Sequence, residues 1–165
     1  MCDHCGFVDY VNPRVVVGTL ATWEERLLVC RRAIEPRAGY WTLPAGFLEQ
    51  GETTGEGAAR EAREEAGAEV EIGPLLGLYD VPRIGQVHIF YRGRLRSPRV
   101  SVGEESLEVA LITWDEVPWE ELAFPSVMWA LQAFDETRGL DVFAPRMTPP
   151  GDRGDFPHDW KGRRP

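Results

Sequence analysis

The chain has 165 residues, of which 43% are hydrophobic, and its formal net charge is −9. This length and composition are typical of a single globular domain that can bury a core, and three cysteines are too few for a disulfide framework. The negative charge argues against nucleic acids and anionic membranes as partners, because their phosphates attract cationic surfaces. No apolar run approaches the length of a transmembrane helix, and the N-terminus lacks the layout of a signal peptide, so we expect a cytoplasmic protein.

The first third of the chain predicts a β-hairpin followed by a loop. Residues 15–23 are apolar and β-branched, which is typical of a buried strand, and residues 27–31 form a second apolar run. The polar residues 24–26 between them indicate a tight turn, so the two strands are predicted to pair. Proline and glycine residues interrupt positions 33–46, which we predict to be a loop.

A helix, four further strands and a second helix follow in chain order. The first helix is predicted from Gly55 to Ala66, with Gly67 as its C-terminal cap. The second helix begins at Pro125 and is closed by Gly139. Its core face comprises Val127, Met128, Leu131 and Phe134. The strands are predicted at residues 68–72, 75–80, 86–95 and 107–114. This order of strands and helices predicts an α/β fold.

Three carboxylates, those of Glu61, Glu64 and Glu65, lie within about 100° of the circumference of the first helix. Alanines gather on its other side and form a thin face that can approach a sheet. Like charges three or four residues apart destabilise a helix, so this edge requires an external positive charge. A hard divalent cation such as Mg²⁺, which binds carboxylate and phosphate oxygens together, meets that requirement. The alternative is a solvated charged face that is held by contacts between Arg60 and Glu64.

The residues around this edge follow a fixed spacing, G-x5-E-x7-R-E-U-x-E-E-x-G-U, where U is aliphatic. All seven fixed positions match, and they are Gly46, Glu52, Arg60, Glu61, Glu64, Glu65 and Gly67. This stretch resembles the Nudix box. Ala62 and Ala68 stand where that family usually has bulkier aliphatic residues, a departure that concerns the packing behind the helix rather than metal chemistry.

The resemblance extends from about Cys2 to Arg138 and implies an α/β/α sandwich around a mixed β-sheet. It also implies the hydrolysis of a nucleoside diphosphate that is linked to another group, by attack of water on phosphorus. By position in the box, the metal ions (Mg²⁺, with Mn²⁺ as the alternative) would be bound by Glu61, Glu64, Glu65 and the carbonyl group of Gly46. Glu52 and Arg60 would brace these carboxylates from behind.

Phosphate binding and water activation need further residues. Arg32, together with Arg31, is placed to meet a substrate phosphate, and the alternative is that both are ordinary arginines at the end of a strand. Many family members use a Glu well after the box to activate or position the water. Glu104, Glu105 and Glu108 are the candidates here, and we prefer Glu105. The alternation of the predicted strand could instead place Glu108 on the sheet, and all three would also fit a solvated loop.

The N-terminus resembles half of the zinc ribbon that one Nudix subgroup carries. Cys2 and Cys5 match one knuckle, but a structural zinc site needs four ligands and only His4 could be added. We therefore expect two free thiols rather than a bound zinc, and His88 and His158 show no ligand spacing. The predicted organisation is a partial zinc-ribbon-like segment at 1–10, a Nudix hydrolase domain at 11–143 and a Pro- and Gly-rich extended tail at 144–165.

The favoured function is a Mg²⁺-dependent pyrophosphohydrolase that acts on ADP-ribose, FAD or NADH and releases AMP. Pro82 lies near the place where ADP-ribose-cleaving relatives often have a proline. Specificity is expected from the loops at 35–40, 81–86 and 103–108. Four aromatic residues are either core residues or partners for a stacked base: Trp41, Phe47, Tyr79 and Phe90. The alternatives are an enzyme that cleaves nucleoside triphosphates, a nucleotide-sensing module with little activity and, ranked last, a zinc-ribbon adaptor. Dimers are common among such relatives, so a homodimer is compatible with these expectations.

Overall fold

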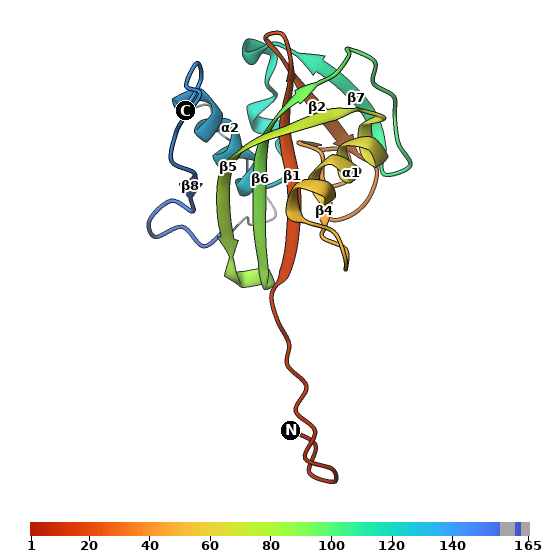
Figure 1. Cartoon of the computed structure of the whole chain (residues 1–165), viewed down its shortest axis with the longest axis vertical. Helices are drawn as coiled ribbons and strands as arrows, with labels where there is room; N and C mark the ends of the chain where they lie inside the picture. Colours follow the sequence, from red (N-terminus) through yellow and green to blue (C-terminus); the bar gives the residue numbers. More distant parts are fainter. Residues whose placement is uncertain (156–160, 163–165) are drawn as a thin grey trace.

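The computed structural model describes residues 1–155 and 161–162, and its centre is one mixed β-sheet (Figure 1). Within the described residues the strand order is β3-β2-β1-β6-β5-β8, while β4 pairs with β1 and β7 pairs with β2. The pairs β1–β6 and β5–β8 are parallel, and the other pairs are antiparallel. The strands are β1 (Arg14–Trp23), β2 (Arg26–Arg32), β3 (Trp41–Thr42), β4 (Ala45–Phe47), β5 (Val70–Val81), β6 (Gln86–Leu95), β7 (Ser106–Ile112) and β8 (Arg146–Met147).

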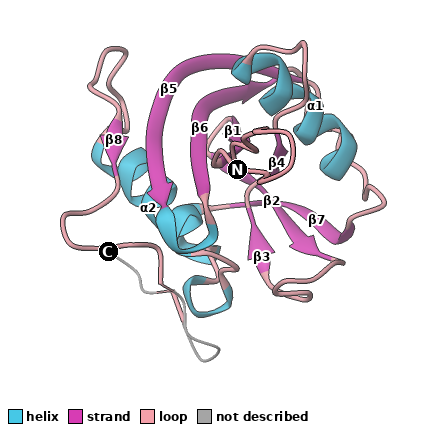
Figure 2. Ribbon diagram, turned by 90° about the horizontal axis from the view of Figure 1, so that it is seen from below, coloured by secondary structure: helices cyan, strands magenta, loops and turns pink. Residues whose placement is uncertain are grey.

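Two α-helices cover opposite faces of this sheet (Figures 1 and 2). The helices are α1 (Thr54–Ala66) and α2 (Pro125–Glu136), and three short 3₁₀ turns are η1 (Pro82–Ile84), η2 (Trp114–Glu116) and η3 (Trp119–Glu121). Leu20 belongs to the core cluster beneath α2, whereas the next residue, Ala21, belongs to the cluster beneath α1. This alternation follows from the two-residue period of a strand. The predicted α/β/α sandwich with a mixed sheet is therefore confirmed.

The predicted hairpin forms, but its two strands stay together only next to the turn. Thr22 pairs with Leu27 and Trp23 pairs with Arg26, after which β2 leaves β1 and pairs with β3 and β7. The vacated edge of β1 is filled by β4, whose Gly46 lies opposite Val17. Residues 33–46, predicted to be a loop, thus contain β3 and the start of β4. That prediction was wrong for these short strands because they are held by partners that are distant in sequence.

Two other element boundaries differ from the prediction. The strands predicted at 68–72 and 75–80 are one long strand, β5, which passes the interruption at Gly73 and Pro74 by shifting its register against β6. Helix α2 ends at Glu136 and is capped by Thr137, whose hydroxyl group donates to the carbonyl oxygen of Ala133 at 2.6 Å. Gly139 lies beyond that cap and does not close the helix. The predicted core face holds at Val127 and Leu131, while Met128 and Phe134 are half-buried.

The N-terminal and C-terminal segments differ in how they lie relative to the sandwich. Residues 1–13 leave it as an arm (Figure 1), and the thiols of Cys2 and Cys5 are exposed on that arm. Hydrogen bonds from the backbone amides of Cys5 and His4 lower the pKa of Cys2. The C-terminal segment is extended, but it also follows the domain surface, because β8 adds a parallel strand to β5 and Gly154 packs against Val81. Phe156 and Trp160 lie outside the described residues. Neither helix of the described chain is long and apolar enough to cross a membrane.

Candidate active site

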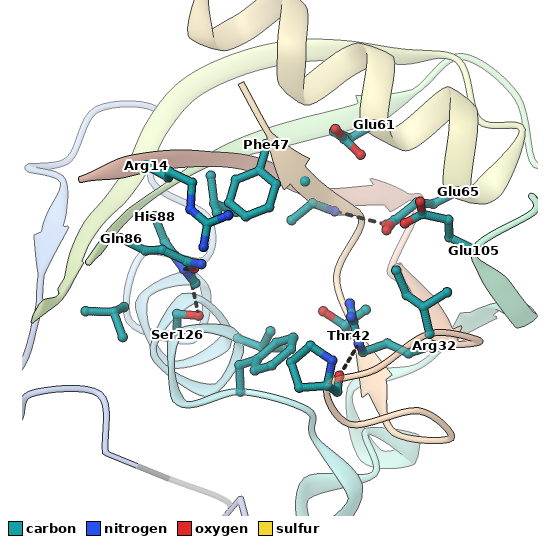
Figure 3. Close-up of a pocket in the computed structure, with 18 of the residues that line it drawn as sticks. Arg14, Arg32, Thr42, Phe47, Glu61, Glu65, Gln86, His88, Glu105 and Ser126 are labelled. Carbon is teal, nitrogen blue, oxygen red and sulfur yellow. Dashed lines mark hydrogen bonds between the residues drawn. The ribbon is translucent and has the colours of Figure 1, made fainter. Parts of the chain in front are cut away.

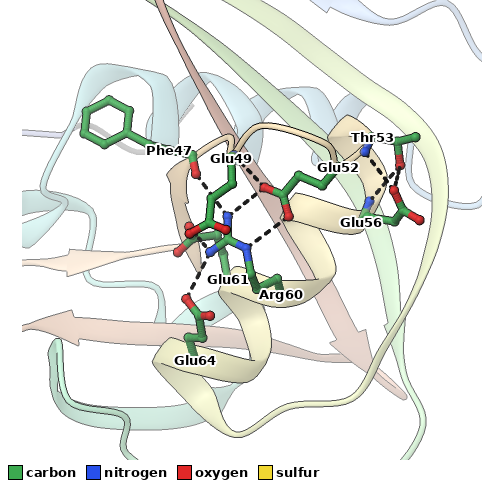
Figure 4. Close-up of polar contacts among 8 residues, drawn as sticks. All are labelled: Phe47, Glu49, Glu52, Thr53, Glu56, Arg60, Glu61 and Glu64. Carbon is green, nitrogen blue, oxygen red and sulfur yellow. Dashed lines mark hydrogen bonds and ion pairs between the residues drawn. The ribbon is translucent and has the colours of Figure 1, made fainter.

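Helix α1 presents the acidic edge, and both of its ends are fixed by the local sequence. Thr53 is the N-cap: its hydroxyl oxygen accepts from the backbone N–H of Glu56, and the Glu56 carboxylate accepts from the backbone N–H of Thr53 at 2.7 Å (Figure 4). Gly67 ends the helix with a φ of 57°, a left-handed conformation that favours glycine. The predicted helix and its C-terminal cap are confirmed. The left-handed backbone conformation at position 67 explains why the box has a glycine there.

Arg60 organises the acidic residues by using every N–H of its guanidinium group (Figure 4). It donates to both oxygens of Glu52 at 2.8 and 3.1 Å, to Glu61 at 2.8 Å and to Glu64 at 3.0 Å. It also donates to the carbonyl oxygen of Phe47 at 3.0 Å. The hydrogen bonds to Glu52 and, to a lesser degree, the one to Glu61 raise the pKa of Arg60. The hydrogen bonds between Arg60 and Glu52 also lower the pKa of Glu52. Arg60 thus contacts Glu52, Glu61 and Glu64 together, while the bracing role of Glu52 and Arg60 stays a prediction.

Gly46 and Gly57 are glycines because carboxylates and a strand approach them closely. A Cβ atom on Gly46 would overlap the carboxylate of Glu61, and one on Gly57 would lie 2.7 Å from a Glu52 oxygen and 2.8 Å from a methyl group of Val17. The first contact places the Glu61 carboxylate directly against the backbone of β4. The second lets α1 lie close to β1.

Glu65 is the most deeply buried acid of the edge among those described. Only 6% of its surface is exposed, and one of its oxygens accepts from the backbone N–H of Ala45 at 3.0 Å (Figure 3). Burial raises its pKa to about 8, and burial also raises the pKa of Glu61, which is 8% exposed. Without a bound cation, the two buried acids therefore hold protons more tightly than exposed acids do. A divalent cation would remove this penalty by compensating their negative charges.

The donor set fits a hard divalent cation that keeps part of its own coordination shell. Among residues 1–155 and 161–162, no three His, Cys, Asp or Glu side chains form a preformed cage for an ion. Mg²⁺ is commonly bound by one or two carboxylates, with water and substrate phosphate oxygens completing its shell. Glu61 and Glu65 are buried beside β4, and the more exposed Glu64 lies one turn after Glu61 and directly before Glu65 on the same helix. The residues present therefore fit Mg²⁺, with the Gly46 carbonyl group as the remaining candidate ligand.

The acidic edge opens into a pocket of about 1120 Å³. Figure 3 shows Glu61, Glu65 and Glu105 on one side of it, with Arg14 and Gln86 on the opposite side. Each of the three loops from which specificity was expected contributes to the lining. These contributions are Glu35 and Pro36, then Val81, Arg83, Ile84 and Gln86, and finally Glu104 and Glu105.

The two arginines predicted to bind phosphate are in different places. Arg32 lines the pocket, donates from Nε to the carbonyl oxygen of Pro36 at 3.0 Å and lies over the ring of Phe124 at 5.0 Å. Burial lowers the pKa of Arg32, and the charge of Glu65 opposes that shift. Arg31 donates to the carbonyl oxygen of Gly39 and forms an exposed ion pair with Glu108 outside the pocket lining. Arg31 is not among the residues that line the pocket, so only Arg32 is retained as a phosphate-binding candidate.

The three candidate acids of the later loop are also separated by the structure. Glu104 and Glu105 line the pocket, and Figure 3 shows the carboxylate of Glu105 near that of Glu65. The charge of Glu105 contributes to the raised pKa values of Glu61 and Glu65. Glu108 lies on β7, where it pairs with Arg31 at 3.8 Å. Glu108 is thus outside the pocket lining, whereas Glu104 and Glu105 are in it, and the choice of Glu105 stays a prediction.

Sequence reasoning missed several residues at the far side of the pocket. Arg14, Gln86, His88 and Ser126 all line it. Gln86 ends one of the loops from which specificity was expected, but it was given no role of its own, His88 had no ligand spacing, and Arg14 and Ser126 were given no role in the site. Their grouping depends on the parallel pairing of β1 with β6, which places Arg14 beside Gln86. The alternation of residues 86–90 could have indicated that Gln86 and His88 share a face, but not which strand lies next to them.

The aromatic residues divide between the core and the pocket. Tyr79 and Phe90 are buried in the core cluster beneath α2, and Trp41 packs against that cluster. Phe47 is 46% exposed and lines the pocket, with the guanidinium group of Arg14 centred 4.6 Å from its ring (Figure 3). Phe90 also lines the pocket but is only 1% exposed, so of the four Phe47 has the most exposed ring in the site.

Known proteins share this arrangement of sequence and fold. The NUDIX domain model matches residues 12–132. A MutT-like protein of Streptomyces ambofaciens is 37% identical over 120 residues, which cover 73% of this chain and 75% of that protein. The ADP-ribose pyrophosphatase of Methanocaldococcus jannaschii is 37% identical over 73 residues, or 44% of this chain and 43% of that protein. The match to the NAD-capped RNA hydrolase NudC of Haemophilus influenzae has 35% identity over 72 residues and covers 27% of that protein.

The likeness extends to the three-dimensional structure. The crystal structure of a NUDIX hydrolase from Nitrosomonas europaea has a TM-score of 0.85 and 42% sequence identity, and the match covers 90% of this chain and 84% of that one. An ADP-ribose pyrophosphatase from Streptococcus suis, at 18% identity and a TM-score of 0.69, shares the fold. The match to the family model covers most of the chain, and the box of that family occupies the acidic edge described above. The chain belongs to the Nudix hydrolase family.

Proposed function

We propose that the protein is a Mg²⁺-dependent pyrophosphohydrolase that cleaves the diphosphate of a nucleoside diphosphate linked to another group. ADP-ribose is the favoured substrate, with FAD and NADH as related possibilities, and AMP is the expected product. The observation that carries this proposal is the packing of Glu61 and Glu65 against β4, within reach of Glu64 and at the edge of a pocket of about 1120 Å³. Pockets of this size accommodate a dinucleotide-sized ligand.

Glu61, Glu64, Glu65 and the Gly46 carbonyl group are the proposed metal ligands. When bound, the metal would neutralise the diphosphate and make a coordinated water a stronger acid. Arg60 and Glu52 would act by position, since they fix the carboxylates rather than touch the substrate. Glu65 must lose its proton to serve as a ligand, which ties metal binding to pH.

Glu105 is the proposed general base. In the reaction, water attacks one phosphorus of the diphosphate and gives a proton to Glu105, while the bond from that phosphorus to the bridging oxygen breaks. The leaving phosphate departs with the bridging oxygen, so ADP-ribose and water give AMP and ribose 5-phosphate. Arg32, on the same pocket wall as Phe124, is the proposed contact for a non-bridging phosphate oxygen.

The substrate proposal has three kinds of support. The ADP-ribose pyrophosphatase of Methanocaldococcus jannaschii matches 44% of this chain at 37% identity. Pro82 begins η1 at the pocket rim, between the lining residues Val81 and Arg83. The net charge of −9 favours a small nucleotide over a long polyanion.

The test is a substrate panel with Mg²⁺ that comprises ADP-ribose, FAD, NADH, diadenosine polyphosphates and nucleoside triphosphates, with products separated by chromatography. We expect AMP from ADP-ribose or FAD at a kcat/KM well above that for the triphosphates. Preferential release of a monophosphate and pyrophosphate from a triphosphate would overturn the substrate proposal. Nucleotide binding without turnover would instead identify a sensing module.

A further inference from the structure

A chain of polar side chains lies at the side of the pocket opposite the acidic edge. Ser126 Oγ lies 2.8 Å from Nδ1 of His88, and Nε2 of His88 lies 2.8 Å from Oε1 of Gln86 (Figure 3). Ser126 is 2% exposed, His88 is 8% exposed and Gln86 is half-buried, and all three line the pocket. The chain thus runs from the buried first turn of α2 to a side chain at the pocket surface.

The direction of the hydrogen bonds follows from the atoms involved. Oε1 of Gln86 can only accept, so Nε2 of His88 carries a hydrogen and donates it. Burial lowers the pKa of His88 to about 4, which keeps its ring neutral at pH 7. Nδ1 is then an acceptor, and the hydroxyl group of Ser126 donates to it. With its oxygen held by His88, Gln86 has its carboxamide NH₂ group left over.

That NH₂ group is available to a ligand. Across the described part of the chain, no residue accepts a hydrogen bond from the Gln86 carboxamide nitrogen. Stability explains why the buried His88 has two hydrogen-bond partners. Stability does not explain why one of these partners, Gln86, lines a large pocket. The hydrogen bond to His88 holds the oxygen of the Gln86 carboxamide toward the histidine. The NH₂ group therefore faces the pocket as a hydrogen-bond donor.

A flat surface lies beside this donor. Arg14 is the parallel-sheet partner of Gln86, and its guanidinium group lies over the exposed ring of Phe47. Guanidinium planes and aromatic rings are common stacking surfaces for nucleobases. Gly46 on β4 lies opposite Val17 of β1. Arg14 is three residues before Val17 on β1, which is about 10 Å at the usual rise of a strand. A diphosphate at the acidic edge could therefore extend a ribose and its base to this surface.

We propose that Gln86 is a specificity-determining residue, which donates from its carboxamide nitrogen to a nucleobase that stacks on the surface formed by Arg14 and Phe47. Ser126 and His88 are positioning residues that hold the carboxamide in the donating orientation. This inference rests on the proposed function only in that the substrate is a nucleotide. It assigns the nucleobase, rather than the sugar or second phosphate, to this side of the pocket.

The direct test measures binding of the four common nucleoside monophosphates and of inorganic pyrophosphate by calorimetry in the presence of Mg²⁺. The variants are Gln86→Glu, which keeps an acceptor for His88 but removes the donor, Gln86→Leu and Ser126→Ala. Gln132→Leu, on α2 and away from the pocket lining, is the matched control. We expect Gln86→Leu to weaken the preferred monophosphate about three- to tenfold, the usual effect of one neutral hydrogen bond. Pyrophosphate affinity should stay unchanged in Gln86→Leu, and Gln132→Leu should match the wild type.

Ser126→Ala separates positioning from stability. Without the Ser126 hydroxyl group, either ring nitrogen of His88 can carry the hydrogen, and the Gln86 carboxamide can turn around. We expect a reduced preference among the four bases, with a smaller loss of affinity than in Gln86→Leu. A purely structural role would instead lower the melting temperature and leave the preference unchanged, which would overturn the positioning assignment.

Other outcomes also decide the inference. It is overturned if Gln86→Leu binds each monophosphate as the wild type does, or if no monophosphate binds more tightly than pyrophosphate. It is also overturned if Gln86→Leu weakens the binding of the monophosphate and of pyrophosphate to the same degree. The last result would identify an anion site. Failure of the proposed function is separate, because it would appear as absent hydrolysis by the wild type, whereas these affinities do not depend on turnover.

Discussion

Arg60 donates to both carboxylate oxygens of Glu52, from Nε to Oε2 at 3.1 Å and from Nη2 to Oε1 at 2.8 Å. The remaining donors of the same group reach Glu61, Glu64 and the backbone of β4. One cation thus offsets part of the repulsion among the acids of α1. Glu65 has no such partner among the described residues and faces the pocket with a raised pKa. The acid that lacks an ion-pair partner therefore lies where a metal ion and a diphosphate would meet.

Replacing Arg60 with Met, which keeps an aliphatic stem, should destabilise the metal-free protein by about 2–3 kcal/mol. The physical reason is that the side chains of Glu52 and Glu61, only 15% and 11% exposed, would lose their partner. Urea unfolding in the presence of a chelator measures this free energy. In a double-mutant cycle with Glu52→Gln, the two changes should be strongly non-additive, and simple additivity would contradict the pairing.

Glu64→Gln and Glu65→Gln should each lower kcat by at least ~10²–10³ while the fold stays intact, the usual scale for one strong electrostatic contributor. The metal-free melting temperature should stay the same or rise, because a repelling acid is removed. Steady-state kinetics with Mg²⁺ and circular dichroism measure both effects. Glu71→Gln, an exposed position on β5, is the matched control and should behave as the wild type does. Near-normal turnover in both box variants would contradict the metal assignment.

The features that depend on local sequence could be predicted. The turn between β1 and β2, the helix α1 with its Gly67 cap, and the start of α2 at Pro125 each carry their own signal in a few adjacent residues. The acidic edge was also predictable, because three residues on one helix share a face whatever the helix packs against. The spacing of the box then connected that edge to a known family.

The features that depend on distant partners could not be predicted. The short strands β3, β4 and β8 form because each pairs with the edge of another strand. Strand β5 continues past Gly73 and Pro74 because it pairs with β6 both before and after this interruption. The same reason applies to the pocket, where β1 places Arg14 beside Gln86 and α2 places Ser126 against His88, the hydrogen-bond partner of Gln86. Nothing in the sequence around Gln86 specifies these partners.

Purified protein should carry clearly less than one equivalent of zinc per chain. Cys2 and Cys5 are both exposed on the N-terminal arm, and a complete site needs two more ligands than this pair provides. Elemental analysis after purification without added metal measures the content. One zinc per two chains, lost in a Cys5→Ser variant, would contradict this expectation and identify an ion shared between two copies.

The stability of the metal-free protein should fall by about 2 kcal/mol between pH 6.5 and pH 8, since one pH unit corresponds to about 1.4 kcal/mol for one group. The folded-state pKa of Glu65, about 8, is above its ordinary value of 4.5, so the folded state binds more protons in this window and loses stability as pH rises. His88 has the opposite shift, to about 4, and reduces stability only as pH falls below about 6.5. Glu65→Gln should remove the fall above pH 6.5 in chelator-treated protein. Because the raised pKa of Glu61 acts in the same direction, the result that would contradict the assignment to Glu65 is an undiminished fall in this variant.

The C-terminal segment should contribute to stability mainly through β8. Ending the chain after Thr148 removes exposed ion pairs, such as Arg83–Asp155 at 3.7 Å, and the packing of Gly154 on Val81, so we expect a loss of about 1 kcal/mol or less. Ending it after Phe143 also removes the pairing of β8 with β5 and the hydrogen bond from the Asp80 backbone N–H to the Thr148 hydroxyl oxygen. These hydrogen bonds should add a further loss of about 2 kcal/mol. Thermal and urea unfolding of the two truncated chains, with their masses in solution, provide the comparison. Equal stabilities would contradict the role of β8, and a large loss or a changed mass after truncation at Thr148 would show that the residues beyond it hold the domain or a second copy.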